Sequence, residues 1–206
     1  MDPGPAPVVA VIGPVGAGKS AVLGFLQELG AATINFDDYS RQLLRPDRPE
    51  TTQVRTAFGP HYVEAGGKVD RAALGALVFA DDQAREQLEG ILHPPMLAQL
   101  RAAVEEFRRD PSAPLLAVEG AILGRLAPEL FDALVQTTAP ANVRVERLRS
   151  KGWSPETIQH VLALQRRLGL DTAAGDFVID GSRPLSDVRE QVVRLWHDLT
   201  GCEGGN

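Results

Sequence analysis

Cysteine is almost absent from this chain of 206 residues, in which Cys202 is the only one. A single cysteine excludes an intrachain disulfide framework and a zinc site built from several thiolates. This scarcity fits a reducing compartment, so we expect a cytoplasmic location. The N-terminal stretch also shows no charged segment followed by a long apolar run, so we expect no secretory signal. No apolar stretch reaches about 18 residues without a charge, so we expect no transmembrane helix and no membrane partner.

Lysine is also scarce, and positive charge is in deficit overall. Lysine occurs only as Lys19, Lys68 and Lys151, and the formal net charge is −6 at pH 7. A double-stranded nucleic acid partner requires a basic face to neutralise its phosphates, so we expect no nucleic-acid binding. A local basic pocket for a small anion is compatible with this balance, which makes Lys19 and Lys151 candidates for function. The sequence does not indicate an oligomeric state.

Five short apolar segments alternate with helical patterns along the chain. The first, "VVAVIG", is a continuous β-branched run, which is typical of a strand buried on both faces of a sheet. Strands that alternate with helices indicate a parallel sheet covered on both sides, the α/β class. The expected strands fall at residues 8–13, 31–36, 114–120, 133–138 and 175–182.

A long helical region separates the second expected strand from the third. Residues 38–110 show almost only helical patterns, and we interpret them as a helical substrate subdomain inserted into one core domain. The core would comprise residues 8–37 and 112–200, and a small lid would span residues 149–166.

Several helix ends carry their own signals. Asp37 or Asp38 is expected near the N-cap of the first inserted helix, and Asp70 and Ser154 are expected to cap later ones. The pair Pro94–Pro95 lies within a helical pattern and predicts a break or kink there, because proline cannot donate the helical hydrogen bond.

The segment "GPVGAGKS" matches the phosphate-binding pattern G-x-x-x-x-G-K-[ST] in full and lies between an expected strand and an expected helix. Glycines let such a loop fold tightly, so that its backbone N–H groups point at phosphate oxygens. Lys19 would reach the β- and γ-phosphates, and the Ser20 hydroxyl would bind Mg²⁺. The pattern therefore predicts ATP and Mg²⁺ as cofactors. The expected nucleotide contacts are Gly13, Pro14, Val15, Gly16, Ala17, Gly18, Lys19, Ser20 and Ala21.

Acidic residues follow two of the expected strands. Asp37 and Asp38 come just after the second, where an aspartate can orient Mg²⁺ or accept a proton from an attacking hydroxyl. The alternative is a helix cap, which accounts for one of the two. Glu119 ends the third strand and can support Mg²⁺, although a solvated charge at a strand end explains it equally well.

A basic run precedes the motif "GWSPE". Arg149 and Lys151 lie next to a glycine hinge and are candidates for a mobile cation that closes over the γ-phosphate. Arg144, by contrast, is expected on a solvated helix face. The cluster Gln165–Arg167 could meet the same phosphates or lie on a solvated face. His93 has no second ligand at a metal-binding spacing, so spacing alone favours a structural histidine.

Taken together, these segments make the sequence similar to the dephospho-coenzyme A kinase family from about Val8 to Leu195. The most specific match is "GGKVDRAALGALVFADDQAREQLEGILHPPM", which resembles that family's G-x-[LV]-D-R-x-x-L…VF-x-D…L…I-x-HP segment. "TINFDDYSRQLL" and "GDFVIDGS" resemble two further family segments. The resemblance implies a P-loop kinase fold and dephospho-CoA as the small-molecule substrate.

The resemblance also implies roles for individual residues. Asp37 takes the place of the base that acts on the substrate's ribose 3′-hydroxyl, and Arg41 matches the arginine that follows it. His93 falls on the family's His-Pro pair in the substrate-facing helices, and either Arg149 or Lys151 supplies the lid cation. The implied substrate contacts are Asp37, Arg41, His93 and Glu119, and the implied metal contacts are Ser20 and Asp37.

The sequence departs from the family pattern mainly where the acceptor is expected. Asn35 replaces an aspartate, and "EGAILGR" (residues 119–125) replaces D-x-P-L-L-[FY]-E. These changes leave the phosphate chemistry intact and concern the identity of the acceptor. Two alternatives therefore stand beside dephospho-CoA phosphorylation: a kinase of the same fold that acts on a nucleoside or another nucleotide, and a nucleotide-binding paralogue without turnover.

Overall fold

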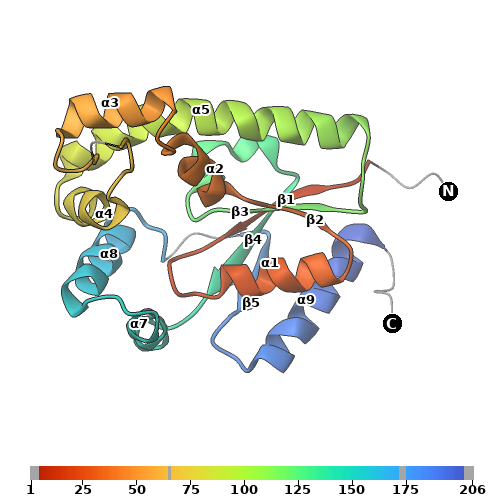
Figure 1. Ribbon diagram of the computed structural model, residues 1–206. Coiled ribbons are helices and arrows are strands. Elements are labelled where there is room, and N and C mark those ends of the chain that lie inside the picture. Colours follow the sequence, from red (N-terminus) through yellow and green to blue (C-terminus); the bar gives the residue numbers. More distant parts are fainter. Residues whose placement is uncertain (1–4, 65, 172–174, 202–206) are drawn as a thin grey trace.

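A parallel sheet of five strands, in the order β2-β3-β1-β4-β5, divides the molecule into layers (Figure 1). The computed structural model describes residues 5–64, 66–171 and 175–201, so Cys202 lies outside it. The predicted five-stranded parallel sheet is confirmed. Its strands are β1 (Val8–Ile12), β2 (Ala32–Asn35), β3 (Leu116–Glu119), β4 (Ala133–Thr138) and β5 (Phe177–Asp180).

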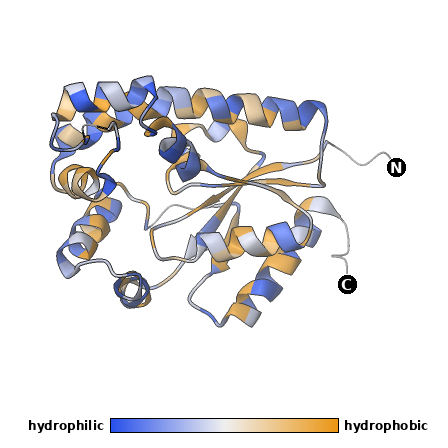
Figure 2. Cartoon of the chain, viewed as in Figure 1, coloured by the Kyte–Doolittle hydropathy of each residue, from blue (hydrophilic) through white to orange (hydrophobic). Residues whose placement is uncertain are grey.

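Strand β1 is the centre of the sheet and pairs with β3 on one side and β4 on the other. All five of its residues are buried, as its continuous apolar run predicts, and Figure 2 shows the sheet as the apolar centre of the fold. Val9 and Val11 face one helical layer, whereas Val8 and Ala10 face the other. This alternation follows from the two-residue period of a strand.

Helices cover both faces of the sheet. Helices α1 and α9 pack below it in Figure 1, and α5 crosses above it with α2. None of the helices formed by the described residues is long and apolar enough to cross a membrane. The helices are α1 (Lys19–Glu28), α2 (Phe36–Leu43), α3 (Pro49–Phe58), α4 (Arg71–Ala80), α5 (Asp82–Arg109), α6 (Leu123–Leu126), η1 (Pro128–Leu130), α7 (Ala141–Ser150), α8 (Pro155–Arg167) and α9 (Leu185–Thr200).

Helix α5 runs without interruption through Pro94 and Pro95, so the predicted break is wrong. Each proline removes one backbone donor, yet the helix buries a long apolar stripe against the sheet that includes Met96, Leu100 and Val104. Tertiary burial of that stripe outweighs the local cost of the prolines.

The N-cap of α2 is Asn35, so the prediction that Asp37 or Asp38 serves as the cap of this helix is wrong. The Asn35 side chain accepts a hydrogen bond from the backbone N–H of Asp37 at 3.0 Å. Both aspartates therefore lie inside the first helical turn and neither is used as the cap. The predicted caps Asp70 and Ser154 are confirmed at α4 and α8.

The helices α3 and α4 lie at the end of the molecule where the strands finish, and α8 lies beside α4 (Figure 1). Helices α3 and α4, with the loop between them, enclose a small apolar cluster of their own, formed by Val54, Val63, Val69 and Leu74. This end of the molecule therefore places helical segments from two distant parts of the chain over the carboxyl edge of the sheet, where α/β proteins bind ligands.

Candidate active site

The segment Gly13–Ser20 forms a tight loop that leads from β1 into the first turn of α1. Its backbone conformation requires a glycine-rich sequence. Gly13 has φ 134°, and a Cβ atom on it would lie 2.2 Å from the carbonyl oxygen of Thr137. Gly18 is the N-cap of α1 and offers no side-chain cap, and the first turn of α1 has no acidic residue. The N-terminal amides of α1 and its partial positive charge are thus directed at whatever anion the loop binds.

Lys19 lies at the start of α1 with its ammonium group folded back onto the loop. Its Nζ donates a hydrogen bond to the carbonyl oxygen of Pro14 at 3.2 Å. Burial lowers the pKa of Lys19, and the carboxylates of Glu119 and Asp37 oppose that shift. The ammonium therefore stands between the loop and two acidic side chains, all at the carboxyl edge of the sheet.

Ser20 and Glu119 meet across this edge. The Ser20 hydroxyl donates to Oε1 of Glu119 at 3.1 Å, and Glu119 is only 7% exposed. Burial raises the pKa of Glu119, although Lys19 and Ser20 pull it down. The second oxygen, Oε2, is buried and finds no hydrogen-bond partner among the described residues. A buried carboxylate oxygen without a partner beside a hydroxyl is a donor set that suits a hard cation such as Mg²⁺.

Two cavities open at this edge, and Asp37 lines both. The first, the P-loop cavity, has a volume of about 660 Å³ and is lined by Lys19, Ser20, Glu119 and Arg41 among others. The second, the acceptor cavity, has a volume of about 360 Å³ and lies between α5 and α8. An aspartate at the junction of a phosphate site and a second cavity is placed to act on a group that enters from the second.

The acceptor cavity has mostly apolar walls with a few polar groups. Leu92 and Met96 of α5 face Val161 and Leu164 of α8 across it. His93 also lines the cavity. Burial lowers its pKa, and the nearby charge of Glu89 raises it by less, so the imidazole is neutral near pH 7. The cavity can thus hold a weakly polar molecule and offer it a few hydrogen bonds.

Among the predicted cations, Lys151 lines the P-loop cavity and Arg149 does not, although both residues are exposed. The neighbouring Arg147, which the sequence left unassigned, contacts the loop directly. Its guanidinium donates to the carbonyl oxygens of Gly16 at 3.1 Å and of Gly181 at 2.6 Å. Arg147 therefore ties the phosphate loop to the segment that follows β5.

Arg144 is buried, with 4% of its surface exposed, so the expectation of a solvated position is wrong. It forms an ion pair with Asp171 at 2.9 Å. Helical periodicity could have predicted which of these cations lie together. Arg144, Arg147 and Lys151 recur at intervals of three and four residues and share one face, whereas Arg149 points elsewhere. Counting charges along the sequence did not distinguish these faces.

The segment "EGAILGR", which departs from the family pattern, places its residues in three different structural environments. Ala121 and Ile122 line the acceptor cavity. Gly124 packs on the core, because a Cβ atom there would lie 3.1 Å from Leu134 Cδ1. Arg125 donates to the carbonyl oxygen of Leu168 at 2.6 Å, at the C-terminal end of α8. Only part of this segment therefore bears on the acceptor.

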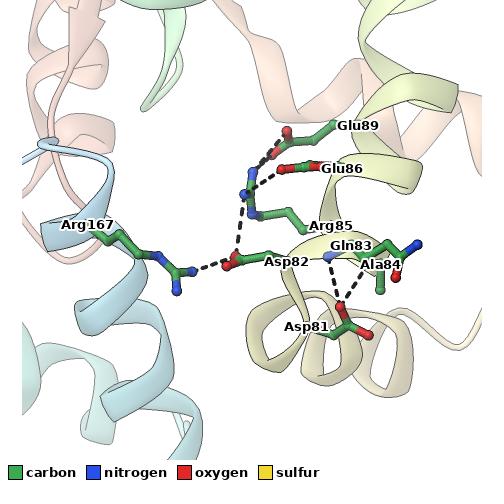
Figure 3. A network of polar contacts seen from close by, with 8 residues as sticks. All are labelled: Asp81, Asp82, Gln83, Ala84, Arg85, Glu86, Glu89 and Arg167. Carbon is green, nitrogen blue, oxygen red and sulfur yellow. Dashed lines mark hydrogen bonds and ion pairs between the residues drawn. The ribbon is translucent and has the colours of Figure 1, made fainter.

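The residues of the cluster Gln165–Arg167 also lie in different environments. Gln165 is buried at the phosphate loop, whereas Arg167 is exposed. Arg167 reaches Asp82 at the start of α5 at 2.6 Å, and Asp82 in turn contacts Arg85 (Figure 3). Arg85 also forms two hydrogen bonds with Glu89, and both residues line the acceptor cavity. The network links α8 with α5 at the rim of that cavity.

The described residues contain no group of three or more His, Cys, Asp or Glu side chains that could hold a metal ion by themselves. A cation at Ser20 would need further oxygen ligands, and phosphate oxygens are the usual source for Mg²⁺. The glycine-rich loop, its lysine and hydroxyl, and an aspartate between two cavities define the class: a P-loop kinase, which transfers phosphate from a nucleotide.

Comparison with known proteins gives the family. A family model described as dephospho-CoA kinase matches residues 7–187. Among curated proteins, the dephospho-CoA kinase of Chromobacterium violaceum is 37% identical over 191 residues, covering 90% of this chain and 91% of that protein. That of Moorella thermoacetica is 34% identical over 196 residues, covering 93% and 92%. The chain belongs to the dephospho-CoA kinase family.

Solved structures agree on the fold. Dephospho-CoA kinase from Campylobacter jejuni superposes with a TM-score of 0.58 at 19% identity, covering 95% of this chain and 98% of that one. Shikimate kinase from Acinetobacter baumannii gives a TM-score of 0.52 at 17% identity, covering 95% and 93%. At these identities the likeness concerns the fold alone.

Proposed function

We propose that this protein transfers the γ-phosphate of ATP to the ribose 3′-hydroxyl of dephospho-CoA, forming coenzyme A and ADP. The family supports the substrate, and the observation that carries the chemistry is the position of Asp37. Asp37 lines both the P-loop cavity and the acceptor cavity. A hydroxyl that enters from the acceptor side meets a carboxylate there before it meets the phosphate.

In the proposed reaction the 3′-oxygen forms a bond to the γ-phosphorus, while the bond from that phosphorus to the bridging oxygen of ADP breaks. Asp37 accepts the hydroxyl proton. Lys19 and the amides at the start of α1 stabilise negative charge on the phosphates, and Lys151 adds a second cation from the same cavity. Arg41, which is paired with Asp38 in α2, also lines this cavity and can bind a substrate anion.

Mg²⁺ fits the residues around Ser20. The Ser20 hydroxyl would bind the ion directly, and Glu119, with its unpartnered buried oxygen, would hold that hydroxyl or an ion-bound water in place. When bound, Mg²⁺ supplies positive charge to the phosphate oxygens. Asp37 lines the same cavity and provides a further carboxylate near this position.

The two segments outside the core would form the acceptor subdomain and the lid. Residues 38–110 would form the acceptor subdomain, because α5 supplies one wall of the acceptor cavity, including His93. Residues 149–166 would form the lid, because this stretch contributes Lys151 to the P-loop cavity and Val161 to the acceptor cavity. The apolar walls suit the long pantetheine arm of dephospho-CoA, which has few charges.

A coupled assay of ADP release tests the proposal, with dephospho-CoA compared against a panel of nucleosides. Release with dephospho-CoA alone is the expected result. Release with a nucleoside alone would replace the acceptor, and no release with any acceptor would make the protein a nucleotide-binding paralogue without turnover.

The role of Asp37 is tested separately by Asp37→Asn, with Asp38→Asn as the adjacent control. Asp37→Asn should lower turnover by about 10²–10⁴-fold, the usual contribution of a general base. Both variants should keep the wild-type melting temperature. Near-normal turnover in Asp37→Asn would remove Asp37 as the base.

A further inference from the structure

Gln165, in the last turn of α8, is held against the phosphate loop by its carboxamide oxygen. Oε1 accepts a hydrogen bond from the backbone N–H of Val15 at 3.1 Å. It also accepts one from Nη1 of Arg144 at 3.4 Å. Gln165 is only 7% exposed although it lies on a helix that borders a cavity. Its position is therefore set by specific polar contacts.

These contacts determine which way the carboxamide points. A backbone N–H and a guanidinium can only donate, so the atom that faces both must be the oxygen. The NH₂ group then faces elsewhere, and it donates none of the hydrogen bonds found among the described residues. Gln165 lines the acceptor cavity, whereas Val15 lines the P-loop cavity. One side chain thus spans the wall between the two sites.

The surroundings of Gln165 hold it in this orientation. Arg144 is buried and its charge is compensated by Asp171 at 2.9 Å, an arrangement that fixes the guanidinium because an unpaired buried charge is costly. Arg125 anchors the end of α8 through the carbonyl oxygen of Leu168 at 2.6 Å. The exposed Arg167–Asp82 pair adds little by comparison. The turn that carries Gln165 is thereby fixed on two sides.

We propose that Gln165 couples the two half-sites of the kinase: its carboxamide oxygen holds the phosphate loop at Val15, and its NH₂ group donates a hydrogen bond to an oxygen of the acceptor substrate. Gln165 would thus align the acceptor hydroxyl with the phosphate that the loop presents. Alignment of this kind contributes strongly to phosphoryl transfer, where the protein acts mainly by positioning. The inference rests on the proposed function, since it assumes an acceptor in the second cavity.

Two substitutions test the oxygen and the NH₂ group of the Gln165 carboxamide separately. Gln165→Glu keeps an acceptor oxygen for Val15 and Arg144 but replaces the NH₂ donor with an oxygen. Gln165→Met keeps the length of the side chain and removes both polar ends. The matched controls are Gln159→Glu and Gln159→Met, because Gln159 is an exposed residue of the same helix. For each protein, kcat and KM for the acceptor are measured at saturating ATP, together with ADP affinity and the melting temperature.

Gln165→Glu should lower kcat/KM for the acceptor by at least about tenfold, while its ADP affinity stays within about threefold of wild type. Gln165→Met should show the same acceptor defect and also weaker ADP binding. The Gln159 variants should resemble wild type. Unchanged acceptor kinetics in Gln165→Glu, or a loss fully matched by a loss of ADP affinity, overturns the inference.

Failure of the proposed function gives a different result. If the wild type phosphorylates another hydroxyl compound and not dephospho-CoA, the proposed substrate is wrong, and the Gln165 variants are compared on the compound that reacts. If the wild type phosphorylates no acceptor, both the proposed function and the role of Gln165 are contradicted.

Discussion

The hydroxyl of Ser20 donates to the buried carboxylate of Glu119 at 3.1 Å, joining two residues that lie 99 positions apart. Ser20 belongs to the first turn of α1, and Glu119 is the last residue of β3. The contact exists because β1 and β3 are adjacent parallel strands, so both chains arrive at the same edge of the sheet. It joins the Ser20 hydroxyl, the proposed Mg²⁺ ligand, to a carboxylate whose second oxygen has no hydrogen-bond partner among the described residues.

Glu119→Gln tests this relationship. The variant keeps the shape and one acceptor oxygen but removes the charge, so turnover should fall by about 10–100-fold, in line with the loss of an outer metal partner. The Mg²⁺ concentration for half-maximal rate should rise. Because burial raises the pKa of Glu119, ionisation costs free energy in the folded protein, and the metal-free variant should be at least as stable as wild type.

The control for that variant is Glu105→Gln, an exposed residue of α5. It should leave both the Mg²⁺ dependence and the melting temperature unchanged. Wild-type Mg²⁺ dependence in Glu119→Gln would show that the carboxylate does not support the ion.

Lys151→Met and Arg149→Met separate the two candidates for the lid cation. Both residues are exposed, but Lys151 lines the P-loop cavity and Arg149 does not. Loss of a cation that stabilises the transferring phosphoryl group should lower kcat by about 10²-fold or more in Lys151→Met. Arg149→Met should stay within about threefold of wild type. Steady-state kinetics at saturating ATP decide the matter, and the reverse order would assign the role to Arg149.

Gly13→Ala should destabilise the protein, and Gly24→Ala should stabilise it. At Gly13 the backbone has φ 134°, and an added Cβ would lie 2.2 Å from Thr137 O. Strain and the clash should lower the free energy of unfolding by roughly 2 kcal/mol or more. At Gly24, inside α1, an added Cβ meets nothing within 4 Å. Alanine there should raise the free energy of unfolding by about 0.5–1 kcal/mol.

Denaturant unfolding of both glycine variants measures these free energies. Equal stability of Gly13→Ala and wild type would mean that the loop rearranges without cost, contrary to the packing of Gly13 against β4.

His93 should make the protein less stable at acid pH. Burial lowers its pKa in the folded state, so in the window between this lowered pKa and the ordinary value the unfolded chain binds more protons than the folded one. Stability therefore rises with pH through that window, and the penalty is complete below the folded pKa. In His93→Gln the pH dependence of unfolding should be flatter across this window. An unchanged profile would show that His93 does not contribute to it.

The parts of the structure that could be predicted from the sequence depend on contacts within a few residues. "VVAVIG" predicts a buried strand because every residue is apolar and most are β-branched, and all of β1 is buried. Ser154 was predictable as an N-cap because a cap is made within one turn, and it accepts from Thr157 N–H at 3.1 Å. Local rules erred where a competing partner was close: Asn35 displaced the aspartates as the cap of α2.

Other errors came from packing between segments that are distant along the chain. Pro94 and Pro95 suggest a break, yet α5 continues because its apolar stripe is buried on the sheet. Arg144 suggests a solvated face, yet it is buried, and Asp171 compensates its charge. In both cases the partner lies far along the chain or in another layer of the fold. Helical periodicity can place Arg144 on one face with Arg147 and Lys151, but it does not identify Asp171 as the partner.

By itself, the sequence determined the α/β class, the phosphate loop and the family, because strand burial, glycine-dependent turns and motif spacing are properties of consecutive residues. Only the tertiary structure decided that Asp37 borders both cavities, that Glu119 meets Ser20 and that Gln165 reaches Val15. Each of these relationships joins segments that the order of the strands brings to one edge of the sheet. Strand order is set by the packing of whole layers, and a side chain acquires its partner across the site only when that packing is complete.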